Sequence, residues 1–425
     1  MKLNWFSPLP PARTAIAAYA AAVLPQLKHY AEVTVWAEEE APAADEVRRY
    51  RCEAPPWNEI GRADVSVYHI GNNTRFHSGI WEISRHHPGI VVLHDARLQE
   101  FVVGHAHQRG APDEYVADMT RYYGQRGRDT AQDLVDGNIP AQVLVEPYPL
   151  TALFVERALG IVVHSDEAFD LAEPHACGPI LRTQLPYPLR QCRPPEREWR
   201  PPFRLVLFGF LGDNRCLDTV LAALRALSKA EDFHLDIYGE LHDSHAWAAR
   251  LVALGLAAHV TLHGFVAANV LEEALDGAHL ALNLRHPSRG ESSFSLLQAW
   301  DHELPVVVMR SGSFEELPGE LVALVRPEAA VDDLLAHLEA LRTGPNRYRA
   351  MGAAARERLL RLHHPTVYAE RLVRLAEHAV TGRTRCNALR MAERAGAVLR
   401  DLISPQQDDA ILRRVAGAVM SLNRG

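Results

Sequence analysis

The sequence lacks several patterns that would point to metal chemistry or a disulfide framework. No CxxC pair occurs, which argues against a zinc site and fits reduced thiols in the cytosol. There is no HExxH sequence, and no two aspartates stand at DxD spacing, an arrangement that often binds divalent metal ions. We therefore expect no metal cofactor. The scattered cysteines are Cys52, Cys177, Cys192, Cys216 and Cys386.

The sequence also lacks an excess of positive charge and a long apolar run. Its net charge is -8, so we expect no nucleic-acid partner that depends on counterion release. The apolar run from Ala15 to Leu24 is too short to cross a membrane, and prolines at positions 8, 10 and 11 precede it. We expect a cytoplasmic protein, and peripheral contact with the inner face of the membrane is left open.

What is present fits a globular protein built from two α/β domains. The chain has 425 residues, 48% of them hydrophobic, which is more than one hydrophobic core normally organises. A proline-rich segment at 186–202 has the character of a linker, and β-rich runs alternate with helical patterns on both sides of it. The expected parts are a domain at 1–190, a domain at 191–365, a helix at 366–380 that crosses back to the first domain, and a helical extension at 381–425.

The most informative stretch runs from Leu284 to Pro318. A loop with Arg285, Arg289 and Glu291 leads to a group of serines that opens a helix, and a β-rich strand follows. Serines at a helix start leave backbone N–H groups and the helix dipole available to an anion, although most such serines are plain N-caps. Because α/β sheets place ligands at strand ends in this order of elements, the stretch predicts a phosphate site.

The segments GESSFSLLQAW, LPVVV and GSFEELP resemble the donor-site signature of the retaining, nucleotide-sugar-dependent glycosyltransferases of family 4. This resemblance, which extends over about residues 1 to 380, implies the GT-B fold, in which two Rossmann-like domains face a central cleft, here with a C-terminal helical extension. The implied reaction moves a sugar from a nucleotide diphosphate sugar to a hydroxyl acceptor with retention at the anomeric carbon. Such enzymes build glycans, polysaccharides or glycoconjugates.

The resemblance assigns donor binding to the second domain. Glu291 would lie beside the donor sugar, and Gln298 takes the place of a glutamate that usually holds the ribose, one residue closer to Glu291 than usual. Arg215, where the family usually has lysine, would neutralise the leaving diphosphate, although from the residues alone a solvated turn arginine is equally common. The Gly264–Val266 turn would hold the nucleobase through its backbone, with a core turn as the alternative. The expected donor-binding residues are Gly209, Asn214, Arg215, Gly264, Phe265, Val266, Ser292, Ser293, Phe294, Ser295 and Gln298.

A second group of candidates lies in the first domain. The β-branched run at 90–93 ends at His94 and Asp95, which places both at the carboxyl edge of a parallel strand. A histidine fixed by its neighbouring aspartate for structural reasons is the alternative. The segments GNN and VLHD resemble the N-terminal domain of the same family, in which this histidine points at the donor sugar. We therefore predict His94, Glu291 and Arg215 as catalytic residues. The expected acceptor or cleft residues are Arg13, Thr14, Ala15, Asn72, Asn73 and Asp95.

The partners implied by the resemblance are a nucleotide diphosphate sugar, with no other cofactor, and a glycan, lipid-linked or small-molecule acceptor. A sugar-nucleotide-binding protein without transfer activity and a sugar-nucleotide epimerase of the same fold stay open as alternatives. The extension could be a cap, a dimer contact or a surface for a membrane-bound acceptor, and the oligomeric state is left open. Its apolar pattern comprises Leu399, Leu402, Ile411, Leu412, Val415 and Val419.

Overall fold

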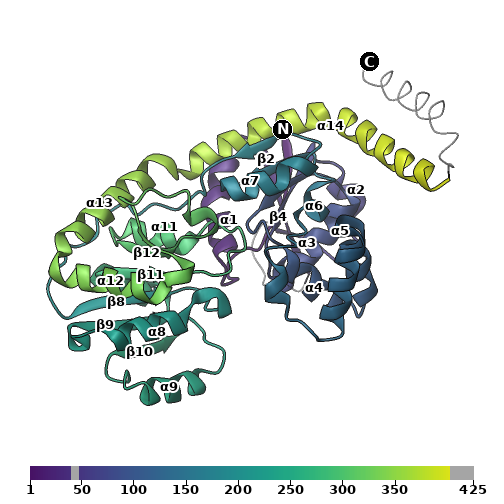
Figure 1. Ribbon diagram of the computed structural model, residues 1–425. Coiled ribbons are helices and arrows are strands. Elements are labelled where there is room, and N and C mark those ends of the chain that lie inside the picture. The colour runs from purple at the N-terminus through teal and green to yellow at the C-terminus, as the bar shows by residue number, and fades with distance from the viewer. Residues whose placement is uncertain (40–46, 403–425) are drawn as a thin grey trace. The chain divides into compact units, whose positions relative to one another are not determined.

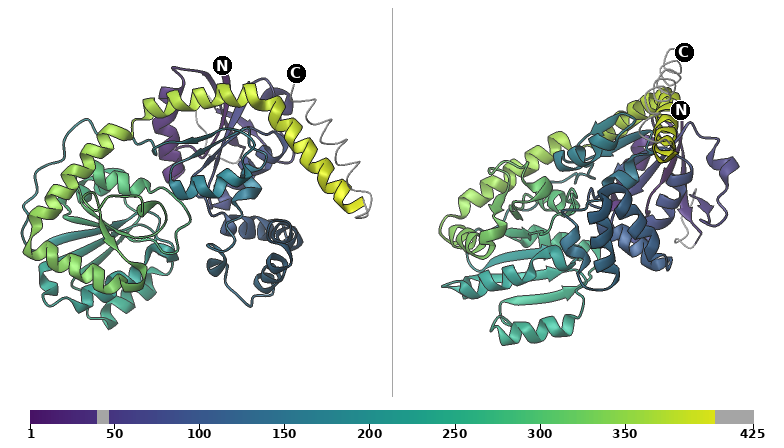
Figure 2. Two further views of the ribbon diagram at one scale, coloured as in Figure 1. Left: turned by 45° about the horizontal axis from the view of Figure 1, so that its top comes forward. Right: turned by 45° about the vertical axis from the view of Figure 1, so that its right-hand side comes forward.

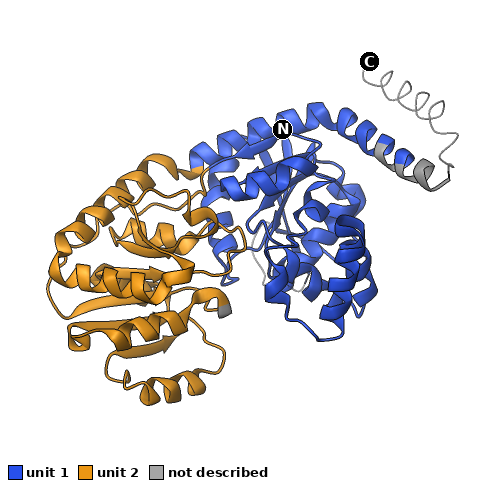
Figure 3. Ribbon diagram, in the orientation of Figure 1, with its two compact units in different colours: residues 1–183, 366–425 blue, residues 184–365 orange. Residues whose placement is uncertain are grey.

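The structure is a computed structural model, and it describes residues 1–39 and 47–402 of the chain. The chain forms two compact units, Met1–Thr183 with Thr366–Gly425 and Gln184–Pro365 (Figure 3). We expected the boundary at 190/191, and the contacts of Arg190 show why this residue belongs to the second unit. Its backbone N–H donates to Asp301 at 3.1 Å and its guanidinium donates to Asp276 at 2.7 Å, both within the second unit.

The first unit contains a parallel sheet of seven strands in the order β3-β2-β1-β4-β5-β6-β7. Every residue of the central strands β4 and β5 is buried, as expected for a sheet that helices cover on both faces. The strand order reverses between β1 and β4, and such a reversal opens a crevice for ligands at the carboxyl ends of the strands. The strands are β1 (Lys2–Phe6), β2 (Glu32–Glu38), β3 (Val47–Tyr50), β4 (Val65–Ile70), β5 (Ile90–Leu93), β6 (Gly160–Val163) and β7 (Ile180–Arg182).

The helices of the first unit lie around this sheet (Figure 1). They are α1 (Ala15–Leu27), α2 (Trp57–Ile60), α3 (Thr74–His86), α4 (Gln99–Gln108), α5 (Pro112–Val135), α6 (Thr151–Val155), α7 (Asp166–Ala172) and α14 (Pro365–Leu402). α5 consists of two helical stretches that meet at Gly124, where φ is 63° and ψ is -151°, outside the helical region.

The long helix α14 packs along the first unit (Figure 2). The ring of Tyr368 lies 5.4 Å from that of Tyr19, and Arg383 donates to the backbone carbonyl of Asp64. Leu399 and Leu402 fall near the end of this helix. The other apolar positions of the expected extension lie outside the described residues; these are Ile411, Leu412, Val415 and Val419.

The second unit repeats the same winding with six parallel strands in the order β10-β9-β8-β11-β12-β13, so its order reverses between β8 and β11. The strands are β8 (Phe203–Phe208), β9 (Phe233–Tyr238), β10 (Val260–Gly264), β11 (Leu280–Asn283), β12 (Val306–Met309) and β13 (Ala323–Val325). The helices are α8 (Leu217–Ala226), α9 (Ser244–Ala253), α10 (Ala268–Gly277), α11 (Phe294–Asp301), α12 (Ala330–Thr343) and α13 (Pro345–Leu362).

Helical periodicity accounts for the core of the second unit. Val220 and Leu224 share one face of α8, Leu334 and Leu338 share one face of α12, and all four are buried. These apolar stripes pack over the buried strand β8 within one hydrophobic cluster. Two doubly wound parallel sheets, each with its own core, confirm the prediction of two Rossmann-like domains.

Candidate functional site

Two loops of the second unit meet where its strand order reverses. One follows β8 and reaches Arg215, and the other follows β11 and runs through Arg285 to Ser293. Because β8 and β11 pair in parallel, both loops leave the same edge of the sheet. They are joined by a hydrogen bond from the backbone N–H of His286 to the carbonyl of Asn214, at 2.9 Å. The carboxyl ends of strands at such a reversal are where open α/β sheets bind ligands.

Arg215 is buried beneath these loops, with 5% of its surface exposed. Its guanidinium donates to the side-chain oxygen of Asn283 and to the carbonyl of Phe208, both at 2.8 Å, while its Nε has no hydrogen-bond partner among the described residues. Burial, and then the positive charge of Arg285, lower the pKa of Arg215 to about 9. The residue remains a cation at neutral pH and is fixed in place before any ligand arrives.

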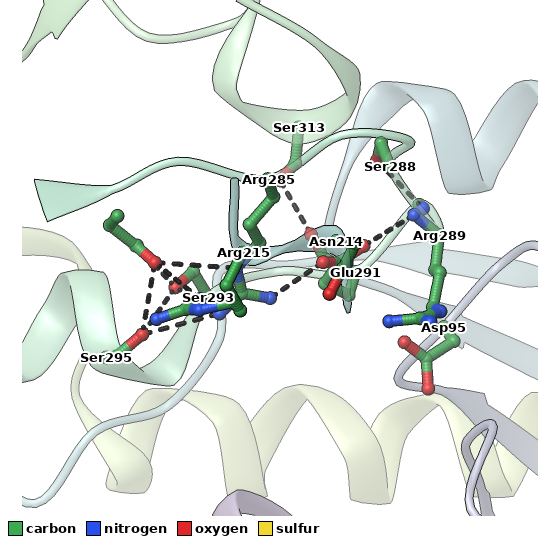
Figure 4. Close-up of polar contacts among 12 residues, drawn as sticks. Asp95, Asn214, Arg215, Arg285, Ser288, Arg289, Glu291, Ser293, Ser295 and Ser313 are labelled. Atoms are coloured by element: carbon green, nitrogen blue, oxygen red, sulfur yellow. Dashed lines mark hydrogen bonds and ion pairs between the residues drawn. The ribbon is translucent and has the colours of Figure 1, made fainter. Parts of the chain in front are cut away.

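Arg285 connects the acidic residue and two serines of the second loop through its guanidinium group (Figure 4). Its Nη1 lies 2.7 Å from Oε1 of Glu291, and its Nη2 donates to the hydroxyls of Ser293 at 3.0 Å and Ser295 at 3.3 Å. The second carboxylate oxygen of Glu291 accepts the backbone N–H of Arg289 at 2.7 Å. Burial raises the pKa of Glu291, but the charge and hydrogen bonds of Arg285 outweigh burial, so the pKa is lowered overall. Glu291 is therefore an anion that orients Arg285.

The site carries more positive than negative charge. Arg215 and Arg285 share a single carboxylate, that of Glu291, and no other carboxylate in residues 1–39 and 47–402 hydrogen-bonds to either guanidinium. A buried charge without a counterion is costly, so an anion bound here would be favoured. Guanidinium groups match phosphate oxygens in geometry as well as in charge.

The start of α11 adds to this preference for an anion. Ser293 caps the helix, because its hydroxyl accepts the N–H of Leu296 at 3.2 Å and also accepts from Asn283 at 2.9 Å. The first N–H groups of a helix have no partner within it, so those of Phe294 and Ser295 point outward at the positive end of the helix dipole. The expected serine cluster is thus an N-cap, and it lies where an anion can also bind.

The residues expected around the nucleotide are distributed along the same edge of the sheet. Gly264 ends β10 with φ of 66°, and the neighbouring Phe265 is 55% exposed. Val266 is partly buried. The amide nitrogen of Gln298 donates to Glu272 on α10 at 3.3 Å. Glu272 was not among the predicted site residues, because its position forms no local motif. Arg285 was noted in the loop of the expected phosphate site but was not assigned a role of its own.

Several residues expected near the acceptor support the backbone of the first unit. Thr14 caps α1 through a hydrogen bond from Ala17 at 3.0 Å, and Asn73 caps α3 through one from Arg75 at 3.1 Å. Asn72 donates its backbone N–H to Asp95 at 2.7 Å and its side-chain amide to the carbonyl of Arg97 at 2.8 Å. Arg13 and Ala15 are exposed.

His94 lies directly after β5, as expected, but its partner was not anticipated. Its Nε2 is 2.8 Å from Nδ1 of His69, a residue of β4, and its side chain makes no hydrogen bond to Asp95. Burial, together with the neighbouring His69, lowers the pKa of His94 well below its usual value. His94 is therefore neutral at physiological pH.

The described residues offer neither a metal site nor a membrane span. No group of three or more His, Cys, Asp or Glu side chains among them could hold a metal ion. None of the described helices is long and apolar enough to cross a membrane.

Residues 202–343, which contain this site, match the family model of the glycosyl transferases group 1. By sequence the chain has no match among curated proteins. By structure it is similar to sucrose-phosphate synthase from Thermosynechococcus elongatus, with TM-score 0.63, 12% identity, and 89% of this chain and 98% of that chain covered. It is also similar to HepE from Anabaena in complex with UDP-glucose, with TM-score 0.57, 12% identity, and 88% of this chain and 98% of that chain covered. A third similar structure is that of WaaG, a glycosyltransferase involved in lipopolysaccharide biosynthesis, with TM-score 0.56, 13% identity, and 87% of this chain and 99% of that chain covered.

At these low identities the structural matches define the fold, which is GT-B with two Rossmann-like domains. Together with the family match of the second unit, they indicate a glycosyltransferase enzyme.

Proposed function

We propose that this protein transfers a sugar from a nucleotide diphosphate sugar to a hydroxyl group of an acceptor, with retention of the anomeric configuration. The observation that carries the proposal is the excess positive charge of Arg215 and Arg285, located beside the N-terminus of α11 at the reversal of the sheet. A diphosphate supplies the missing negative charge. The complex of HepE with UDP-glucose, which has the same fold, supports a nucleotide sugar as the source of that diphosphate.

The two arginines would act on the leaving group. When the bond between the anomeric carbon and the phosphate oxygen breaks, negative charge develops on the diphosphate, and cations that are already in place stabilise it without reorganisation. Arg215 is fixed by Asn283 and Phe208, and Arg285 is fixed by Glu291. In this proposal Glu291 acts at least in part through Arg285, and its contact with the donor sugar stays a prediction.

The same charges lead to the prediction that no divalent metal is needed, because two guanidinium groups supply the positive charge that a metal ion often provides at a leaving diphosphate. The first unit would bind the acceptor, a glycan, a lipid-linked molecule or a small molecule. The resulting product would belong to glycan, polysaccharide or glycoconjugate biosynthesis.

The proposal is tested first by thermal unfolding with UDP-, GDP-, ADP- and TDP-sugars, one of which should stabilise the wild-type protein. Arg285→Gln should abolish that stabilisation. Arg250→Gln is the matched control, because Arg250 also pairs with a carboxylate, that of Asp218 at 2.7 Å, but on the exposed surface of α9. The control should respond to the donor as the wild type does.

Mass spectrometry of the stabilising donor with a panel of hydroxyl acceptors then tests transfer, and NMR of the product gives the anomeric configuration. Conversion of the donor to an isomeric sugar without acceptor would instead identify an epimerase. Binding without turnover in any mixture would identify a binding protein. If none of the four donors stabilises the protein, the proposed site is wrong.

A further inference from the structure

A buried histidine and a partly buried one in the first unit form a pair whose hydrogen-bond direction can be worked out. His69 is in β4 and His94 follows the adjacent parallel strand β5. The Nδ1 of His69 lies 2.8 Å from the Nε2 of His94, so one nitrogen carries the hydrogen and the other accepts it. Burial lowers the pKa of both imidazoles well below the usual value, which keeps each ring neutral with a single N–H.

The surroundings of His69 decide between the two directions. The residue is fully buried, and its Nε2 has no hydrogen-bond partner among the described residues. Its ring is covered by Trp5, whose centroid lies 4.2 Å away, and by Tyr19, at 5.3 Å. If His94 donated the hydrogen bond, the proton of His69 would be on Nε2, as a buried N–H with no acceptor. Orphaned backbone N–H groups are rarer in protein interiors than under-satisfied backbone acceptors, and we apply the same order to the two imidazole nitrogens.

The opposite direction avoids this cost. When His69 donates from Nδ1, its Nε2 is a bare acceptor against aromatic rings, and the Nε2 of His94 accepts. The proton of His94 must then be on its Nδ1. That nitrogen makes no hydrogen bond with any described residue, and His94 is only partly buried, so the Nδ1–H can reach a ligand.

We propose that His69 is a positioning residue that fixes His94 as the Nδ1–H tautomer, so that His94 presents a hydrogen-bond donor at the carboxyl edge of the first unit's sheet. In this state His94 cannot act as a general base through Nδ1. It recognises an oxygen that accepts a hydrogen bond, such as a sugar hydroxyl. The identity of that ligand rests on the proposed function, whereas the tautomer does not.

The tautomer can be read directly by NMR. Long-range proton–nitrogen correlation spectra of the full-length protein with ¹⁵N-labelled histidine distinguish protonated from unprotonated ring nitrogens. Loss of one signal set in His94→Gln assigns His94. We expect a protonated Nδ1 and an unprotonated Nε2 for both His94 and His69. A protonated Nε2 on His94 would overturn the proposal, whatever the activity.

Two substitutions of His69 test its effect on turnover. In His69→Asn the side-chain amide nitrogen takes the place of Nδ1 and can still donate to His94. In His69→Gln the amide reaches the place of Nε2 instead and leaves His94 without its donor. Once a transfer reaction is available, we expect His69→Asn to keep much of the wild-type rate and His69→Gln to lose at least about tenfold, the effect of one hydrogen bond.

Thermal unfolding with donor distinguishes a loss of turnover from a loss of folding in the two His69 variants. Both variants should show the thermal stabilisation by donor that the second unit provides. Equal rates for His69→Asn and His69→Gln would contradict a positioning role. If the NMR result is as expected but His94→Gln turns over normally, the tautomer stands and the proposed contact of His94 with substrate fails.

Discussion

Substitutions in the ion pair between Arg285 and Glu291 can distinguish its contribution to the stability of the second unit from its contribution to ligand binding. Both side chains are largely buried, with 16% and 10% of their surface exposed, and their closest atoms are 2.7 Å apart. Arg285→Gln leaves the Glu291 carboxylate without its partner. Removing one member of a buried pair costs about 3–5 kcal/mol, which corresponds to a loss of roughly 6–20 °C in unfolding temperature for a unit of this size.

The double variant Arg285→Gln/Glu291→Gln removes the stranded charge as well. Most of the cost of the single substitution comes from the buried charge that it leaves unpaired, so the double variant should regain most of the lost unfolding temperature. It should not regain diphosphate binding, because Arg285, one of the two cations that bind the phosphate, is still absent. Glu291→Gln alone should keep diphosphate binding, since both guanidinium groups remain and the amide oxygen that replaces the carboxylate can still accept from Arg285.

Thermal unfolding and calorimetric titration of all four proteins with a nucleoside diphosphate complete this cycle. If the double variant binds the diphosphate like the wild type, Arg285 has no role in binding. If Arg285→Gln unfolds at the wild-type temperature, the buried ion pair contributes nothing to stability.

Three further outcomes are expected. Arg215→Ala should lower turnover by about 10²-fold or more. Arg215→Lys should keep the positive charge but lose the two hydrogen bonds to Asn283 and Phe208. Wild-type rates in both variants would exclude Arg215 from the reaction. Burial lowers the pKa of His77 and of His363 from 6.5 to about 4, so between these pH values the unfolded chain binds more protons than the folded chain. Each residue should therefore lower the free energy of unfolding by up to about 3 kcal/mol as the pH falls from 6.5 to 4. An unfolding temperature that does not change over this pH range would contradict this. Turnover should persist in a chelator, and loss restored only by added metal would disprove a metal-free reaction.

Most of the strands and helices could be predicted because each has a recognisable local sequence pattern. β6 is a β-branched run at 160–163, and α8 repeats apolar residues at helical spacing. The strands that the sequence did not indicate are β3, β7 and β13, all at or near sheet edges. β3 reads VRRY and the other two have three residues each, so neither length nor apolar content distinguishes them from loops. Short, charged edge strands limit edge-to-edge pairing but leave a weak signal.

The candidate site could be predicted only where its residues form a local pattern. The turn with Arg215 and the serine-rich start of α11 were both found, but Asn283, which joins them, lies 68 positions after Arg215 and has no motif of its own. His69 reads as an ordinary core residue of β4, and only the pairing of β4 with β5 brings it to His94. Partners of this kind are fixed by tertiary structure, so spacing along the chain cannot predict them.

We propose above all that the second unit binds the diphosphate of a sugar donor through Arg215 and Arg285. Calorimetric titration with matched pairs of ligands, each nucleoside diphosphate against its own nucleoside, tests it most directly. For one of uridine, guanosine, adenosine and thymidine, the diphosphate should bind one per chain and at least about 100-fold more tightly than the nucleoside, because two charge-assisted contacts to phosphate are gained. Equal affinity within every pair, or no binding by any diphosphate, would contradict the claim.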